Sequence, residues 1–198
     1  MTSSLIYKSE SMYELAMLFL YGRHYADRYL AIAGLIPAGA SVLDLCCGPA
    51  VLYHRYLRLK SVTYTGLDIN PRFIDRLNRR GGDGRLWDLR KADALPPADY
   101  VIMQASLYHF LPDASPVVDR MLEAARKRVI VAEPIRNLTA GDSKLLSVLG
   151  RLFTNPGTGQ QPLRFTEATL SELFSAYSAR IVESRSIAGG REKMFVLK

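Results

Sequence analysis

Five short strand-like segments alternate with helix-like segments along the middle of the chain, and this alternation restricts the possible folds more than any other feature. The predicted strands cover residues 41–46, 61–68, 85–91, 98–105 and 128–133. Most of them consist of apolar and β-branched residues, as is typical of strands buried in a sheet. Because strands separated by helices pair in parallel, the sequence predicts an α/β protein with a doubly wound, mostly parallel sheet.

The segments before and between these strands have apolar residues at helical spacing. The predicted helices cover residues 9–35, with a break at Gly22, and residues 49–60, 70–80 and 113–126. Asn70-Pro71 is a typical helix start, and the glycine-rich residues 81–84 are a typical helix end. Residues 1–37 are therefore expected to form an N-terminal helical cap or lid beside a Rossmann-like sheet.

The last part of the chain departs from the alternation. Residues 166–177 predict a helix that begins with a capping-box-like segment, and residues 180–187 and 191–197 predict two strands joined by a hairpin-type turn. The predicted sheet therefore has seven strands and ends in an antiparallel pair. Residues 137–163 fit neither pattern and are interpreted as an insertion between the fifth strand and the last helix. A length of 198 residues suits a single domain, residues 1–198.

Charge and cysteine content restrict partners and location. The 26 Lys and Arg residues outnumber the 19 Asp and Glu residues and give a formal net charge of +7. These basic residues are scattered, so a merely basic surface is favoured over a nucleic-acid partner. Cys46 and Cys47 are the only cysteines, and two adjacent cysteines suggest neither a disulfide nor a zinc site. We expect a cytoplasmic protein without a metal, a signal peptide or a membrane span.

A turn of small residues follows the first predicted strand. This strand contains Asp44, and the chain then passes through Cys46, Cys47 and Gly48 into a helix. Small residues allow the backbone to approach a ligand closely. The spacing is neither that of a dinucleotide fingerprint nor that of a phosphate-binding loop. An acid beside a tight turn instead suits a ligand that carries a cation, such as an ammonium or a sulfonium group.

Polar residues also follow the other predicted strands. Asp68 ends the second strand, roughly 20 residues beyond the first motif, where an acid can bind ribose hydroxyls. Asp93 follows the third strand, Gln104 lies at the end of the fourth, and His109 follows the fourth. Because the carboxyl ends of parallel strands share one edge of the sheet, these residues are expected to surround a common site.

Taken together, these segments resemble the class I S-adenosylmethionine-dependent methyltransferases. The turn at Asp44 resembles the first motif of that family, Asp68 its ribose-binding acid, and Asp93-Ala94 its adenine-edge site. The resemblance covers roughly residues 38–198 and depends on the combination of motifs. Cys46 and Ala50 stand where the family usually has glycine, which is the main departure from the pattern.

The resemblance implies that the cofactor is S-adenosylmethionine and assigns residues to it. Asp44 and the backbone through Gly48 would hold the methionine end, and Gln104 would flank the sulfonium. Asp68 would accept hydrogen bonds from the ribose, and Ile69 would pack on the adenine. The complete set of implied cofactor-binding residues is Asp44, Leu45, Cys46, Gly48, Asp68, Ile69, Asp93, Ala94 and Gln104.

The acceptor side has weaker signals. His109 is the candidate general base, because a histidine titrates near neutral pH, although a structural role fits its position equally well. The candidate acceptor-contacting residues are Tyr7, Tyr13, Tyr25, Tyr108 and Glu133. Glu133 has the alternative role of capping a loop. The segment that begins at Gln104 lacks the Asn/Asp-Pro-Pro-aromatic motif of many enzymes that methylate base amino groups, which argues against that class.

The function that these features favour is S-adenosylmethionine-dependent methyl transfer to a small-molecule acceptor. Two alternatives remain open at this point. The net charge of +7 suggests a nucleic-acid methyltransferase, most simply one that acts on RNA. The replacement of two glycines suggests a methyltransferase-like protein that binds the cofactor, or another protein, without catalysis.

Overall fold

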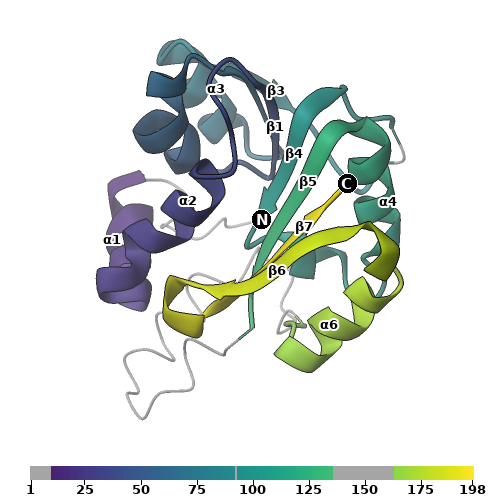
Figure 1. The fold of residues 1–198 in the computed structure, drawn as a ribbon. Coiled ribbons are helices and arrows are strands. Elements are labelled where there is room, and N and C mark those ends of the chain that lie inside the picture. The colour runs from purple at the N-terminus through teal and green to yellow at the C-terminus, as the bar shows by residue number, and fades with distance from the viewer. Residues whose placement is uncertain (1–9, 92, 136–162) are drawn as a thin grey trace.

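A seven-stranded mixed sheet forms the centre of the computed structural model, which describes residues 10–91, 93–135 and 163–198, without the side chains of residues 10–14 and 16 (Figure 1). The strand order is β3-β2-β1-β4-β5-β7-β6. The first five strands run parallel, and β7 runs antiparallel between β5 and β6. The strands are β1 (Ser41–Leu45), β2 (Thr63–Asp68), β3 (Asp83–Leu86), β4 (Ala98–Gln104), β5 (Ala125–Pro134), β6 (Ile181–Ile187) and β7 (Glu192–Leu197). The predicted fold class is confirmed.

The strand order reverses at β1, which lies between β2 and β4. In a doubly wound sheet, this switch point opens a crevice at the carboxyl ends of the strands. Leu45, at the end of β1, is in register with Leu67 of β2 and Met103 of β4. The residues that follow these two partners, Asp68 and Gln104, therefore lie at the same edge of the sheet as the turn after β1.

Helices cover both faces of the sheet (Figure 1). The helices α1 (Glu10–Tyr21), α2 (Tyr25–Ala33) and α3 (Pro71–Arg79) lie on one face, and α4 (Ser115–Ala124) and α6 (Glu167–Ser175) lie on the other. Gly22, with a φ of +54°, separates α1 from α2, as predicted. Among the described residues, no helix is long and apolar enough to cross a membrane.

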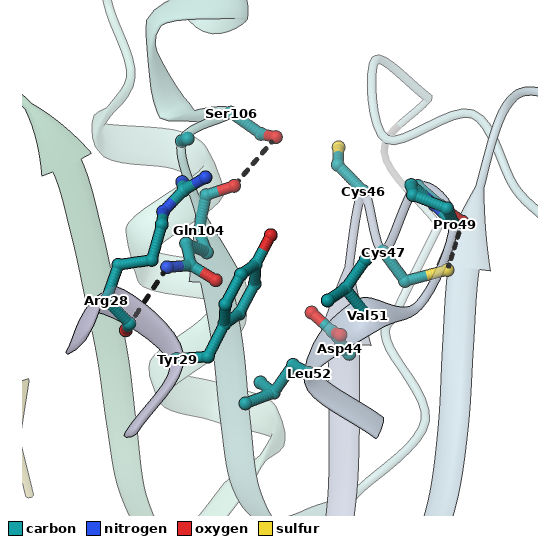
Figure 2. Close-up of a pocket in the computed structure, with 12 residues that line it drawn as sticks. Arg28, Tyr29, Asp44, Cys46, Cys47, Pro49, Val51, Leu52, Gln104 and Ser106 are labelled. Atoms are coloured by element: carbon teal, nitrogen blue, oxygen red, sulfur yellow. Dashed lines mark hydrogen bonds between the residues drawn. The ribbon is translucent and has the colours of Figure 1, made fainter. Parts of the chain in front are cut away.

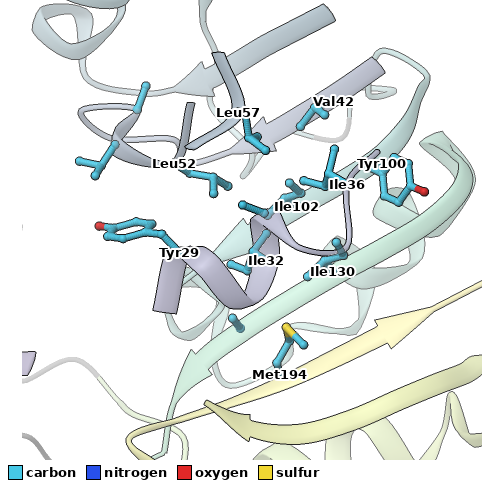
Figure 3. Close-up of a cluster of buried hydrophobic side chains, with 14 of the residues drawn as sticks. Tyr29, Ile32, Ile36, Val42, Leu52, Leu57, Tyr100, Ile102, Ile130 and Met194 are labelled. Carbon is cyan, nitrogen blue, oxygen red and sulfur yellow. The ribbon is translucent and has the colours of Figure 1, made fainter. Parts of the chain in front are cut away.

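Successive residues of the central strands pack into two different apolar clusters. Ile102 and Ile130 pack with Ile32 of α2 in the first cluster, which Figure 3 shows. Their neighbours Val101 and Val129 pack in the second cluster, with residues of α4 and α6. Because strand side chains alternate between faces, one sheet supplies the core of both layers. This packing holds the carboxyl ends of the strands in place beneath the crevice.

The structure differs from the predicted boundaries in several places, including the start of β5, which is Ala125 instead of Arg128. β3 lies at residues 83–86 instead of 85–91, because Asp88 accepts hydrogen bonds from the backbone and side chain of Arg90 in a local turn. The helical segment after β1 spans residues 51–60 and is π-helical over Tyr53–Leu57. The cap of α6 pairs Thr166 with the Thr169 hydroxyl and does not use an acid. The predicted insertion at 137–163 lies, except for its last residue, outside the described residues.

Gly66 of β2 lies directly behind the turn that follows β1. A methyl group at this position would be 2.8 Å from both Cys47 Sγ and Leu77 Cδ2. We therefore expect Gly66→Ala to lower the free energy of unfolding by about 1–3 kcal/mol, as is usual for overpacking of a core. Urea denaturation measures this change. An unaltered stability would contradict the close packing of Cys47 against β2.

Candidate functional site

A small open cavity of about 60 Å³ lies at the carboxyl ends of β1 and β4. It is lined by Arg28 and Tyr29 of α2, by the turn after β1, and by residues 104–106 at the end of β4. Figure 2 shows Arg28 and Tyr29 across the cavity from Asp44. Four of the predicted cofactor-binding residues line this cavity, namely Asp44, Cys46, Gly48 and Gln104. The cavity therefore occupies the switch-point crevice.

The turn after β1 has an unusual backbone. Cys46, Gly48 and Ala50 have φ angles of +55°, +54° and +53°. This left-handed region is easily reached by glycine and costs free energy for residues with a Cβ. The Cys47 N–H donates to the Leu67 carbonyl, and the Ala50 N–H donates to the Cys47 carbonyl, both at 3.0 Å. Cys46 and Ala50 thus adopt the left-handed conformation that glycine reaches most easily.

Asp44 places a buried carboxyl group in the cavity, where its side chain is only 5% exposed. The Tyr64 hydroxyl donates a hydrogen bond of 2.7 Å to Asp44 Oδ2. Burial raises the pKa of Asp44 to about 7, and the nearby Asp68 contributes in the same direction, although the Tyr64 hydrogen bond opposes the shift. A cationic ligand group beside Asp44 would favour its ionised form.

Asp68 connects the end of β2 to the turn. Its Oδ2 accepts the Gly48 N–H at 2.8 Å, and its Oδ1 accepts the Asn70 N–H at 2.7 Å. Burial raises its pKa, and these two hydrogen bonds partly offset the increase. Because an ionised carboxylate can accept about four hydrogen bonds, capacity remains for ligand hydroxyls. Leu45 is fully buried, so only its backbone is available to a ligand.

The residues predicted for the adenine lie outside the cavity lining. Ile69 is 55% exposed, directly after Asp68 at the end of β2. Asp93 and Ala94 are also exposed, in the segment between β3 and β4. The structure thus places Ile69 beside the β2 end of the crevice and does not bring the Asp93 and Ala94 side chains into the cavity.

Sequence reasoning missed Arg28, a buried cation in the cavity wall. Its side chain is 2% exposed, and its Nη2 lies 2.7 Å from Glu192 Oε1 on β7. Its guanidinium also lies over the Tyr21 ring, 4.2 Å from the centroid, and the Tyr21 hydroxyl donates to the same Glu192 oxygen. A signal was present in the sequence, because Arg28 occurs between Tyr25 and Tyr29 on the apolar face of a predicted helix.

Glu133 lies behind the cavity wall and does not line the cavity. Its side chain is fully buried, and its Oε1 accepts the backbone N–H groups of Ser106 and Leu107, both at 2.6 Å. Burial raises its pKa to about 8, and these two hydrogen bonds oppose the increase. Glu133 therefore holds the loop after β4, which is the capping role considered from the sequence.

His109, the candidate base, lies outside the cavity with an exposed side chain. Its ring contacts the ring of Tyr108, with a centroid distance of 4.0 Å. Partial removal from water and the charge of Arg164 lower the pKa of His109 to about 4. At neutral pH the imidazole is therefore uncharged, and the role of His109 as a base stays a prediction.

The predicted acceptor-contacting tyrosines have different positions. Tyr25 is buried and packs edge-to-face on Tyr29, with ring centroids 5.4 Å apart. Tyr108 is buried at the start of the loop after β4, beneath the guanidinium of Arg164. Tyr7 and the side chain of Tyr13 lie outside the described residues. In the described part of the chain, no group of three potential ligand residues is arranged to hold a metal ion.

Comparison with known proteins gives matches only at the level of structure. No protein-family model and no curated protein matches the sequence. One match is a chain in the structure of the complex between the Haloferax volcanii Trm112 methyltransferase activator and the putative methyltransferase. Its TM-score is 0.65 and its identity 13%, over 91% of this chain and 92% of that chain. A TehB-like S-adenosylmethionine-dependent methyltransferase from Corynebacterium glutamicum matches with a TM-score of 0.58 and 15% identity, over 86% of each chain.

A third match is the magnesium protoporphyrin IX methyltransferase of Synechocystis PCC 6803 with bound S-adenosylhomocysteine. Its TM-score is 0.54 and its identity 19%, over 85% of this chain and 77% of that chain. The chain has the class I methyltransferase fold. The family resemblance seen in the sequence motifs is therefore confirmed for the fold, and the class I fold places Asp44, Asp68 and Gln104 at the ends of β1, β2 and β4.

Proposed function

We propose that the chain binds S-adenosylmethionine in this cavity and transfers its methyl group to a small-molecule acceptor. One observation carries the proposal: a buried acid, Asp44, and a buried cation, Arg28, line the same cavity from opposite sides (Figure 2). The methionine end of the cofactor has an ammonium and a carboxylate group. Asp44 offers a partner for the ammonium group, and Arg28, which also pairs with Glu192, offers one for the carboxylate group.

The remaining residues along the switch-point edge suit the rest of the cofactor. Asp68 has acceptor capacity for the ribose hydroxyls, and Ile69 presents an exposed apolar side chain for the adenine ring. Asp93 and Ala94 are accessible for the edge of the adenine. Gln104 lines the cavity at the end of β4, and its Nε2 donates to the Arg28 carbonyl at 3.4 Å. This hydrogen bond connects the end of β4 to α2 beside the methionine end.

S-adenosylmethionine supplies a methyl group on a sulfonium, which is already activated for transfer. The contribution of the protein is then to hold the two reactants in line and to exclude water. Tyr29 and Gln104 line the cavity next to Arg28, where the ring face of the tyrosine and the amide oxygen suit a cationic centre. Glu133 supports this wall through the backbone of Ser106 and Leu107.

The affinity for S-adenosylmethionine is expected to depend on pH through Asp44. With a pKa of about 7, Asp44 is mostly protonated below that pH and must lose its proton to pair with the ammonium group. We expect the affinity to rise with pH up to about 7 and then to level off, with a decrease of up to about tenfold per unit at lower pH. Calorimetry on both sides of pH 7 measures this dependence.

Asp44→Asn is the matched variant for the pH experiment. It keeps an acceptor for the Tyr64 hydroxyl but cannot ionise, so its affinity should be lower and should not change around pH 7. Glu192, which pairs with Arg28, and Asp68 are unchanged in this variant. A wild-type affinity that is constant across this range would show that Asp44 does not face the cationic end of the ligand.

The proposal as a whole is tested by calorimetric titration with S-adenosylmethionine, followed by a transfer assay with a labelled methyl group. Saturable binding is expected, and label should enter small molecules from a metabolite extract. No binding at high micromolar cofactor would overturn the proposal. Label that enters only added RNA would show a nucleic-acid methyltransferase, and binding without any transfer would show a non-catalytic protein.

A further inference from the structure

Arg164, which precedes α6, forms the clearest charged feature outside the cofactor cavity. Its guanidinium carbon lies 3.4 Å from the centroid of the Tyr108 ring. Stacking of this kind uses the flat face of the guanidinium, so the N–H groups at its edge stay available to a ligand. Within residues 10–91, 93–135 and 163–198, no carboxylate forms an ion pair with Arg164 and no acceptor takes a hydrogen bond from it.

The titratable groups that face Arg164 do not compensate its charge. Glu133 of β5 and His109, in the loop after β4, both interact with it electrostatically. Glu133 is protonated at neutral pH, because its burial outweighs the opposing effect of Arg164 on its pKa. His109 is neutral at the same pH. Of the described groups around Tyr108, Arg164 therefore contributes the one net positive charge, which stacking on an aromatic ring does not cancel.

Topology places this charge on the acceptor side of the site. The cofactor's ribose acid, Asp68, belongs to β2, on one side of β1, whereas β4 and β5 lie on the other side. Ser106 lines the cavity, and its N–H donates to Glu133, which interacts electrostatically with Arg164. Tyr108 follows Ser106 by two residues. Arg164 thus belongs to the β4 and β5 side of the switch point, across β1 from Asp68.

We propose that Arg164, stacked on Tyr108, binds a carboxylate group of the methyl acceptor, so that the substrate is an organic acid. The planar fork of a guanidinium matches the two oxygens of a carboxylate, and a ring beneath it fixes its orientation. The net charge of +7 also attracts anionic molecules to the protein. This inference depends on the proposed function and adds the chemical class of the acceptor to it.

The test compares benzoate with benzamide, which has nearly the same shape without the charge. Binding of each is measured by NMR titration, with and without S-adenosylhomocysteine. We expect the wild type to prefer benzoate, and Arg164→Gln to weaken benzoate binding about tenfold or more while leaving benzamide unchanged. Arg126→Gln is the matched control, since it removes one charge from an exposed residue at the amino end of β5.

Separate measurements distinguish a failure of this inference from a failure of the proposed function. Arg164→Gln should bind S-adenosylmethionine as the wild type does, and Arg164→Lys should restore only part of the benzoate affinity because it lacks the planar fork. Equal binding of benzoate and benzamide by a wild type that binds the cofactor would overturn the inference alone. A preference for inorganic phosphate over benzoate would also overturn it. Benzoate binding without the cofactor remains measurable if the proposed function fails.

Discussion

Replacement of Arg28 by methionine is expected to lower the free energy of unfolding by about 3–5 kcal/mol, the usual cost of removing one partner of a buried ion pair. Glu192 is fully buried on β7, and its Oε1 lies 2.7 Å from the guanidinium of Arg28. Without Arg28, this carboxylate must either remain charged in a dry environment or take up a proton. Urea denaturation at neutral pH measures the loss.

The double variant Arg28→Met/Glu192→Gln is the control. A glutamine at position 192 keeps an acceptor for the Tyr21 hydroxyl and carries no charge, so most of the lost stability should return. The double variant should still bind S-adenosylmethionine weakly, because the partner of its carboxylate group is absent. Equal destabilisation of the single and double variants would show that Arg28 stabilises the fold through packing and not by neutralising the charge of Glu192.

Asp68→Ala is expected to lower the affinity for S-adenosylmethionine by at least about tenfold. Hydrogen bonds to a charged group contribute about 1.5–3 kcal/mol each, and the ribose would lose its acceptor. In the wild type, the N–H groups of Gly48 and Asn70 donate hydrogen bonds to Asp68. The variant loses both bonds, so the turn after β1 also loses its side-chain connection to β2. Calorimetric titration at a pH above 7 isolates this effect from the titration of Asp44.

Asp83→Ala provides the comparison for Asp68→Ala. Asp83 is an exposed acid at the start of β3, where it pairs with Arg85, and its removal changes the net charge equally. We expect its cofactor affinity to match the wild type. Urea midpoints for both variants establish that each is folded. An unchanged affinity in a folded Asp68→Ala protein would remove Asp68 from the binding site.

The fold could be predicted because local patterns were strong and consistent. Apolar runs of strand length, separated by capped helices, indicate the parallel sheet, and the hairpin chemistry of residues 188–190 indicates the antiparallel end. The boundaries of β3 could not be predicted in this way. There, the Asp88 side chain accepts the backbone N–H of Arg90, which forms a turn in place of further strand pairing. A hydrogen bond from Arg120 to the Leu89 carbonyl stabilises this turn.

The site was predictable where function follows from position at a strand end. Asp44, Gly48 and Gln104 were found because they lie at or near the carboxyl ends of predicted strands, and all three line the cavity. Arg28 was missed because its partner, Glu192, is distant in sequence and becomes a neighbour only in the folded sheet. The position of His109 after β4 could be predicted from the sequence. Its pKa could not, because burial and the neighbouring Arg164 determine it.

A crystal structure with S-adenosylhomocysteine would show directly whether these residues hold the cofactor. We expect the ribose hydroxyls to bind Asp68, the amino-acid end to lie between Asp44 and Arg28, and the sulfur to lie beside Gln104. A ligand bound elsewhere on the protein would contradict this account. So would a ligand in the cavity with its ribose turned away from Asp68 and its carboxylate group in solvent.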